Sequence, residues 1–241
     1  LDDLQAHLME KGWLEKTYLG INENPLDVTI AAAKFIKAHS KNWKITNAGD
    51  WHPELTELLD DYSPVISSEP RPKELADRKA RGFTTTYYVC CTPAQPNNFV
   101  FSTPAEGAFI SWYAASYGYD GFLRWAYDAW PTDPTRDARH VVWPAGDCFL
   151  IYPGGTSSIR FERLREGIVD FEKIAILRKL GTRSNDKKVK KSMEDFVTYL
   201  SALSLERDHG KRDYNPEKIK ESLRKGNLMI ENLSNELSRN E

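Results

Sequence analysis

The sequence lacks features that mark several common classes of protein. It has three cysteines, Cys90, Cys91 and Cys148, with no C-x-x-C pair, so neither a zinc site nor a redox dithiol is indicated. Adjacent Cys90 and Cys91 would alternate faces on a strand, which favours small packed side chains over a disulfide between them. No apolar run is long enough to cross a bilayer, and no signal peptide is visible.

A large excess of one charge is also missing. The formal net charge of -2 gives no electrostatic reason to expect nucleic acid or an anionic membrane as a partner. The sequence has no phosphate-binding loop, nucleophile elbow or histidine cluster with metal-ligand spacing, so no cofactor or metal is expected. The chain begins with leucine, not methionine, so we expect a processed or partial chain, whose missing signal peptide says nothing of export.

The patterning alternates between strands and helices, in a composition typical of globular proteins. Strands are expected at residues 17–21, 44–48, 64–67, 84–91 and 121–127. Helices are expected over residues 2–11 and from near Pro25, Pro53, Lys73 and Ala105. This alternation predicts an α/β fold with a parallel sheet, either a small doubly wound sheet or part of an eight-stranded barrel. The Pro25 helix is predicted to face the core with Val28, Ala31, Ala32, Phe35, Ile36 and His39.

The rest of the chain is predicted to be a long loop and then helices. Residues 128–157 have no regular pattern and are rich in Pro, Gly and Trp, which is typical of a functional loop. Helices follow at 159–180, 189–203 and 216–237. The first of them is expected to face inward with Leu164, Ile168, Phe171 and Ala175, and to be capped by Gly181.

Polar and aromatic residues follow each predicted strand. In a (β/α) barrel, catalytic residues lie at this carboxyl-terminal face, which favours the barrel over the doubly wound sheet. Glu23 is the most prominent of them, although an acidic residue here is also typical of a solvated first helical turn. The others are Asn22, Asn47, Asp50, Trp51, Ser67, Glu69, residues 91–95, Tyr127 and Asp128.

Four longer motifs resemble a known family. They read E-K-G-W-L-E-K-T-Y-L-G-I-N-E-N-P, Y-D-G-F-L-R-W-A-Y-D-A-W, W-P-A-G-D-C-F-L-I-Y-P-G and S-S-I-R-F-E-R-L-R-E-G-I-V-D-F-E-K-I. In this order, from about His7 to Leu180, they resemble the catalytic domain of glycoside hydrolase family 123, part of which is catalogued as domain of unknown function 4091. The resemblance implies the C-terminal part of a (β/α)8 barrel over residues 1–182, with a helical extension packed on it over 183–241. It also implies that the first barrel strands and a β-sandwich domain belong to the intact protein or to a second chain.

The resemblance implies a β-N-acetylgalactosaminidase-type reaction. In the family an Asp-Glu pair closely followed by Pro works by substrate assistance, in which the sugar's own acetamide oxygen attacks the anomeric carbon. Glu23 falls on the acid/base position, and Asn22 falls on the position that usually holds Asp. Asparagine can still accept the acetamide N–H, but it supplies no charge to stabilise the cationic intermediate.

Five further residues are candidates for binding the sugar. Trp125 and Tyr127 are two residues apart on a predicted strand, so they would share a face that can stack on a sugar ring and bond its polar groups. Tyr88 is a candidate for the acetamide carbonyl, and Asp50 and Trp51 could edge the pocket. For each aromatic residue, ordinary core packing is the alternative.

Three functions remain open at this stage. The first is a retaining exo-acting β-hexosaminidase for terminal N-acetylgalactosamine or a related sugar. The second is a glycosidase with a second carboxylate such as Asp50, Glu69 or Asp128, and the third is a glycan-binding protein without activity. The expected partner is therefore a glycan, with neither nucleic acid nor membrane insertion. The resemblance also implies a periplasmic, cell-surface or secreted location.

Overall fold

The computed structural model describes residues 1–205 and 215–239. The chain divides into two compact units, Leu1–Tyr88 and Val89–Glu241. The predicted division into a barrel part (1–182) and a helical extension (183–241) stays a prediction, and residues 206–214 and 240–241 of that extension lie outside the described residues.

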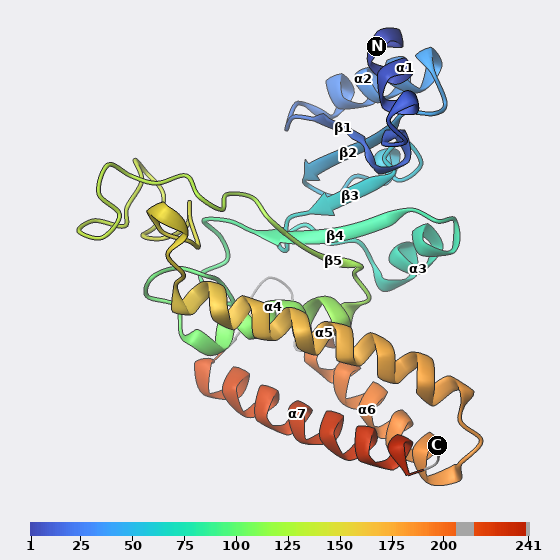
Figure 1. The fold of residues 1–241 in the computed structure, drawn as a ribbon, viewed down its shortest axis with the longest axis vertical. Helices are drawn as coiled ribbons and strands as arrows, with labels where there is room; N and C mark the ends of the chain where they lie inside the picture. The colour runs from blue at the N-terminus through green and yellow to red at the C-terminus, as the bar shows by residue number, and fades with distance from the viewer. Residues whose placement is uncertain (206–214, 240–241) are drawn as a thin grey trace. The chain divides into compact units, whose positions relative to one another are not determined.

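The first unit is a parallel sheet with helices (Figure 1). Its strands β1 (Tyr18–Ile21), β2 (Lys44–Gly49), β3 (Asp61–Pro64) and β4 (Thr84–Val89) lie side by side in chain order, and each pair is parallel. Its helices are α1 (Asp2–Glu10), α2 (Leu26–His39) and α3 (Pro72–Ala80), with short 3-10 turns η1 (Leu14–Lys16) and η2 (Pro53–Leu55). The α/β class predicted from the alternation is confirmed.

Two apolar clusters hold this unit together. The larger consists of Ala33, Ile45, Leu55, Leu59 and Tyr62, which are all buried. It joins α2 to β2, β3 and the segment that follows η2, because parallel strands flanked by helices must bury their apolar faces. The second cluster joins α1, η1 and the start of β2.

The second unit is mainly helical (Figure 1). It contains α4 (Pro104–Tyr117), strand β5 (Gly121–Arg124), η3 (Pro153–Gly155), α5 (Ile159–Arg183), α6 (Lys187–Leu205) and α7 (Pro216–Ser238). Helix α4 contacts α5, α6 and α7, and 11 of its 14 residues are buried, as expected of a helix that is apolar on every side. Residues 128–157 form the predicted long loop, with isolated bridges and η3 as the regular structure described there.

The structure corrects several predicted boundaries. Strand β3 begins at Asp61, three residues before the predicted start at Pro64, and a 3-10 turn replaces the helix predicted from Pro53. Strand β5 ends at Arg124, where the sequence predicted a strand up to residue 127. Gly181 is not a helix cap, since α5 continues to Arg183.

The inward faces of two helices are also corrected. In α2, Val28 and Phe35 are exposed, whereas Ala33 is buried. Helix α2 carries two apolar stripes, and periodicity alone could not decide which one faces the sheet. In α5, Ile168 is exposed and Gly167 is buried, because a close approach of α4 selects the stripe with the small residue.

Candidate active site

The site is built around the short connection between β1 and α2. Strand β1 ends at Ile21, and Asn22 and Glu23 follow it before Pro25 begins the helix. The Asn24 Nδ2 atom donates to the Asn22 carbonyl at 2.9 Å, which closes the turn locally. Both Asn22 and Glu23 are exposed, so their side chains are accessible to a ligand.

Glu23 contacts a tyrosine on β4, which lies three strands away from β1 in the sheet. The Tyr88 hydroxyl donates to Glu23 Oε1 at 2.9 Å, and Tyr88 is itself buried on β4. In a flat sheet β1 and β4 would lie about 14 Å apart, and side chains stand nearly perpendicular to a sheet. The contact therefore indicates that this sheet curves and that Glu23 and Tyr88 share its concave face. The structure thus brings together two of the predicted site residues.

Strand β2 supplies two more neighbours of Glu23. Asn47 is buried, and its Nδ2 atom donates to the carbonyls of Ile21 at 2.8 Å and Asn22 at 3.4 Å. Gly49 has a φ of +150°, and a Cβ atom placed on it would lie 3.7 Å from Glu23 Cγ and 3.9 Å from Asn47 Oδ1. The sequence marked Asn47 as a polar residue near a strand end, but its bonds to the β1 turn required the structure.

Asp50 and Trp51 follow β2 in the same unit, where backbone and ring contacts hold them. The Tyr62 hydroxyl donates to the Asp50 carbonyl and accepts from the His52 amide at 2.9 Å. The rings of Trp51 and Tyr62 stack with centroids 5.0 Å apart, and burial raises the pKa of Tyr62 to about 12. The Trp51 ring therefore packs against the core cluster, which is the alternative that the sequence left open. A sugar-contacting role for Asp50 and Trp51 stays a prediction.

Trp125 and Tyr127 belong to the second unit and lie beyond the end of β5. Their predicted place on a strand is wrong, because the backbone after Arg124 turns to pair with the long loop: Tyr127 O accepts from the Leu150 amide at 2.9 Å. The rings of Tyr127 and Phe161 pack in a T-shaped arrangement with centroids 5.8 Å apart. Trp125 and Tyr127 are both exposed, and sugar binding by them stays a prediction.

A buried ion pair lies beside Trp125. Asp147 Oδ1 is 3.5 Å from Arg124 Nη2 and accepts from Trp125 Nε1 at 3.2 Å. Trp143 meets the same indole edge-on, with ring centroids 5.5 Å apart. Burial lowers the pKa of Arg124 to about 10 and raises that of Asp147, with Trp125 and Arg124 opposing the shift at Asp147. The sequence missed this group because Asp147 lies within the long loop, 22 residues after Trp125.

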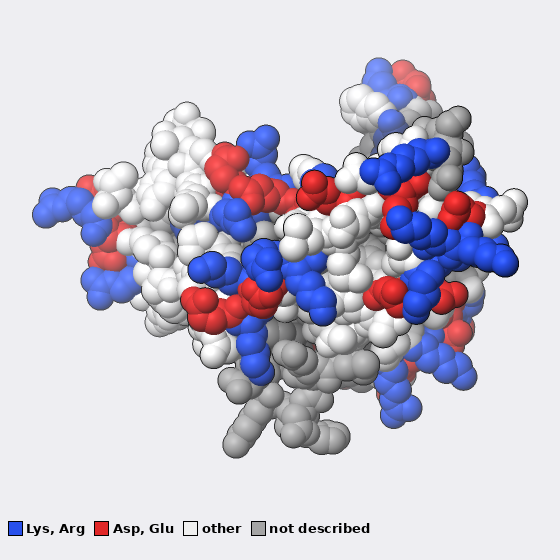
Figure 2. Space-filling model, turned by 90° about the horizontal axis from the view of Figure 1, so that it is seen from below, with Lys and Arg blue, Asp and Glu red and all other residues white. Residues whose placement is uncertain are grey.

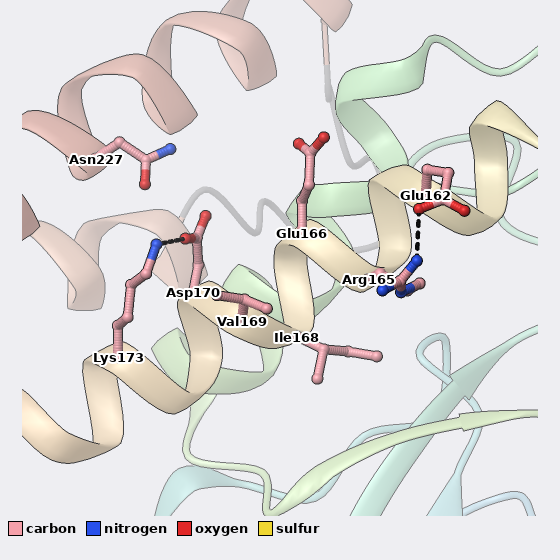
Figure 3. Close-up of a pocket in the computed structure, with 8 residues that line it drawn as sticks. All are labelled: Glu162, Arg165, Glu166, Ile168, Val169, Asp170, Lys173 and Asn227. Carbon is pink, nitrogen blue, oxygen red and sulfur yellow. Dashed lines mark hydrogen bonds and ion pairs between the residues drawn. The ribbon is translucent and has the colours of Figure 1, made fainter.

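A surface cavity of about 570 Å³ lies between α5 and α7, and ion pairs within α5 engage charged side chains of its lining (Figure 3). Its charged side chains pair along α5, with Glu162 bound by Arg165 at 2.8 Å and Asp170 bound by Lys173 at 3.1 Å. Each pair joins residues three positions apart on α5, so these charges stabilise the helix.

The surface is consistent with a small net charge. On the face drawn in Figure 2, basic and acidic residues are interspersed, without a broad field of one sign. Across the described ranges 1–205 and 215–239, no helix is sufficiently long and apolar to span a membrane. No His, Cys, Asp and Glu cluster suited to a metal ion occurs within the same ranges.

Comparison with known proteins points to one family. The family model described as glycoside hydrolase 123, catalytic domain, matches residues 1–177. A solved structure of a family 123 glycoside hydrolase from Clostridium perfringens, described in work on glycolipid glycan hydrolysis, is similar with a TM-score of 0.78 and 28% sequence identity. No curated protein sequence matches the chain significantly.

The structural match covers 98% of this chain and 44% of the Clostridium protein. The chain thus spans less than half the length of the protein that it resembles. This coverage, with the parallel strands and flanking helices, confirms the prediction of an α/β fold that forms part of a barrel.

Proposed function

The chain belongs to glycoside hydrolase family 123, as part of its catalytic domain, and from this premise we propose that the protein is a retaining glycosidase for terminal β-linked N-acetylhexosamine. N-acetylgalactosamine is the proposed sugar, and substrate assistance is the proposed mechanism. The Clostridium relative supports a glycan as the substrate class. We place the protein in the periplasm, at the cell surface or outside the cell.

Glu23 is the proposed acid and base. It donates a proton to the leaving glycosidic oxygen while the substrate's acetamide oxygen attacks the anomeric carbon, and an oxazolinium intermediate forms as the leaving group departs. The resulting carboxylate then takes a proton from the water that opens this intermediate. Asn22 accepts the acetamide N–H through its side-chain oxygen and so orients the attacking oxygen.

The observation that carries the proposal is the exposed Glu23 carboxylate held at 2.9 Å by the buried Tyr88 hydroxyl. A carboxylate at the carboxyl end of a parallel strand occupies the catalytic face of a barrel. The tyrosine fixes one carboxylate oxygen, which limits the side-chain motion that proton transfer must overcome. Neighbouring Gly49 carries no side chain, so the space beside Glu23 Cγ stays open.

Hydrolysis of an aryl 2-acetamido-2-deoxy-β-galactoside by the purified protein and its Glu23→Gln variant tests this function. Glutamine keeps the shape but cannot donate or accept the proton, so kcat/KM should fall by about 100- to 10,000-fold. Glu10→Gln, on the exposed face of α1, is the matched control and should keep wild-type activity. Full activity of the Glu23→Gln variant would refute the assignment.

A second function, glycan binding without turnover, is favoured by Asn22 alone. The family's Asp would stabilise the positive charge of the intermediate, and a neutral side chain in a water-poor site gives up on the order of a few kcal/mol of that stabilisation. Asn22→Asp separates the two functions. If the wild type is a glycosidase, kcat rises about tenfold or more in the variant from a measurable starting value. A wild type that binds glycan without turnover would instead support the second function.

A further inference from the structure

Asn47 makes contacts that the proposed roles of Asn22 and Glu23 do not use. It lies on β2 and is buried, and among the described residues its side chain links that strand to the β1 turn. Both acceptors of its Nδ2 atom are carbonyl oxygens, those of Ile21 and Asn22. A reversed amide would set its oxygen against two other oxygens, so the hydrogen bonds define which way the group points.

The other end of the amide faces the space beside Glu23. Asn47 Oδ1 accepts no hydrogen bond from any described residue, and it is not among the buried atoms without a partner. A Cβ atom built on Gly49 would lie 3.9 Å from this oxygen and 3.7 Å from Glu23 Cγ. The free acceptor and the acid/base side chain therefore border the same space, which glycine leaves empty.

We propose that Asn47 has two linked roles in the proposed glycosidase, on which this inference rests. Its amide nitrogen positions the Asn22–Glu23 turn, and its Oδ1 atom accepts a hydrogen bond from one hydroxyl group of the bound sugar. An acceptor held by its own buried nitrogen is already oriented, so binding the hydroxyl costs little side-chain entropy. Asn47 thereby selects sugars that carry a hydroxyl at one ring position.

The two roles predict different kinetic effects of Asn47→Ala. Loss of the turn's support misplaces Glu23, so kcat should fall about 10- to 100-fold. With the wild type, kcat/KM should be about tenfold higher for the parent glycoside than for the analogue that lacks the contacted hydroxyl. Loss of the acceptor should abolish this difference. A merely structural residue would not alter the ranking of such analogues.

The experiment compares wild type and Asn47→Ala on an aryl 2-acetamido-2-deoxy-β-galactoside and its 3-, 4- and 6-deoxy analogues. We expect one deoxy analogue to react more slowly than the parent with the wild type and at the parent's rate with the variant. Asn97→Ala is the matched structural control. Asn97 is a buried asparagine of the second unit whose Nδ2 also donates to two carbonyls, those of Cys90 and Pro93.

The outcomes separate this inference from the proposed function. Wild-type turnover with the same analogue ranking in both proteins would overturn the role of Asn47 and leave the glycosidase standing. Without wild-type turnover the glycosidase proposal fails, and calorimetric binding of the same four glycosides to both proteins then tests the acceptor by the same ranking. If Asn47→Ala does not fold, Asn47→Leu, which has a similar volume and no hydrogen-bonding atom, takes its place, and an unchanged ranking in that variant overturns the inference.

Discussion

At the residue scale, the arrangement of the site depends on a few hydrogen bonds between strand ends. Glu23 is exposed and acquires its geometry from two buried residues: the Tyr88 hydroxyl binds its carboxylate and the Asn47 amide binds its turn. Because one bond holds the Glu23 carboxylate and the other holds its turn, a change in either residue should lower activity.

Tyr88→Phe tests the contact with Glu23. The aromatic ring keeps its packing while the hydroxyl that holds Oε1 is lost. Loss of one hydrogen bond corresponds to about a tenfold effect, so kcat should fall by about tenfold. Steady-state kinetics and far-UV circular dichroism are the measurements. Tyr18→Phe, on exposed β1, is the control and should leave kcat unchanged. A wild-type kcat in Tyr88→Phe would contradict a positioning role.

The raised pKa of Tyr62 predicts how the stability of the first unit changes at alkaline pH. Burial raises its pKa to about 12, so between pH 10 and that value the unfolded chain loses the phenolic proton while the folded one retains it. The stabilisation is complete below pH 10 and decreases by about 1.4 kcal/mol per pH unit as the pH rises through this window.

Urea unfolding at several pH values, for the wild type and Tyr62→Phe, measures this effect. The variant should be less stable at pH 7, because the bonds with Asp50 and His52 are gone, and its free energy of unfolding should fall less steeply above pH 10. Parallel slopes in the two proteins would show that Tyr62 does not titrate in this window.

At the element scale, helix contacts in the second unit depend on glycine. A Cβ atom on Gly167 of α5 would lie 2.4 Å from the Ala108 carbonyl oxygen of α4. Two helices can approach this closely only where one of them has no side chain. This packing explains why α5 turns Gly167 inward and exposes Ile168.

Gly167→Ala should therefore destabilise the protein although alanine is the better helix former. Overpacking against a rigid backbone costs about 1–3 kcal/mol, which exceeds the gain of about 1 kcal/mol in helix propensity. Thermal or urea unfolding measures the difference. Gly20→Ala is the matched control, since nothing lies within 4 Å of a Cβ atom there. Equal stability of Gly167→Ala and the wild type would show that α4 and α5 can separate without cost.

At the scale of the whole molecule, positive and negative charges nearly balance. The formal net charge is -2, and the face in Figure 2 shows both signs interspersed. A neutral sugar gains nothing from long-range steering by such a surface. The substrate proposed for this protein is neutral, which makes ionic strength a useful probe.

KM for the aryl N-acetylgalactosaminide should change less than about twofold when salt rises from about 0.05 to about 0.5 M, because screening acts on charged partners. Initial rates across a salt series measure this. A chromogenic substrate with an anionic aglycone serves as the comparison at each salt concentration. A steep rise of KM with salt for the neutral substrate would indicate that a charged group enters the site.

The sequence by itself determined the features that depend on neighbours along the chain. Helices α6 and α7 follow from their apolar periodicity, and the parallel order of strands follows from their alternation with helices. Glu23 was found because a strand, a turn and a helix are all local signals, and the four motifs that indicated the family are local as well.

Only the tertiary structure decided which partners those elements meet. It turned the Ala33 stripe of α2 inward, gave Trp51 a packing partner in Tyr62, and brought Tyr88 from three strands away to Glu23. The physical reason is that periodicity states which residues share a face but not which face is covered. That choice depends on close approaches and hydrogen bonds between residues distant in the chain, such as the 65 positions that separate Tyr88 from Glu23.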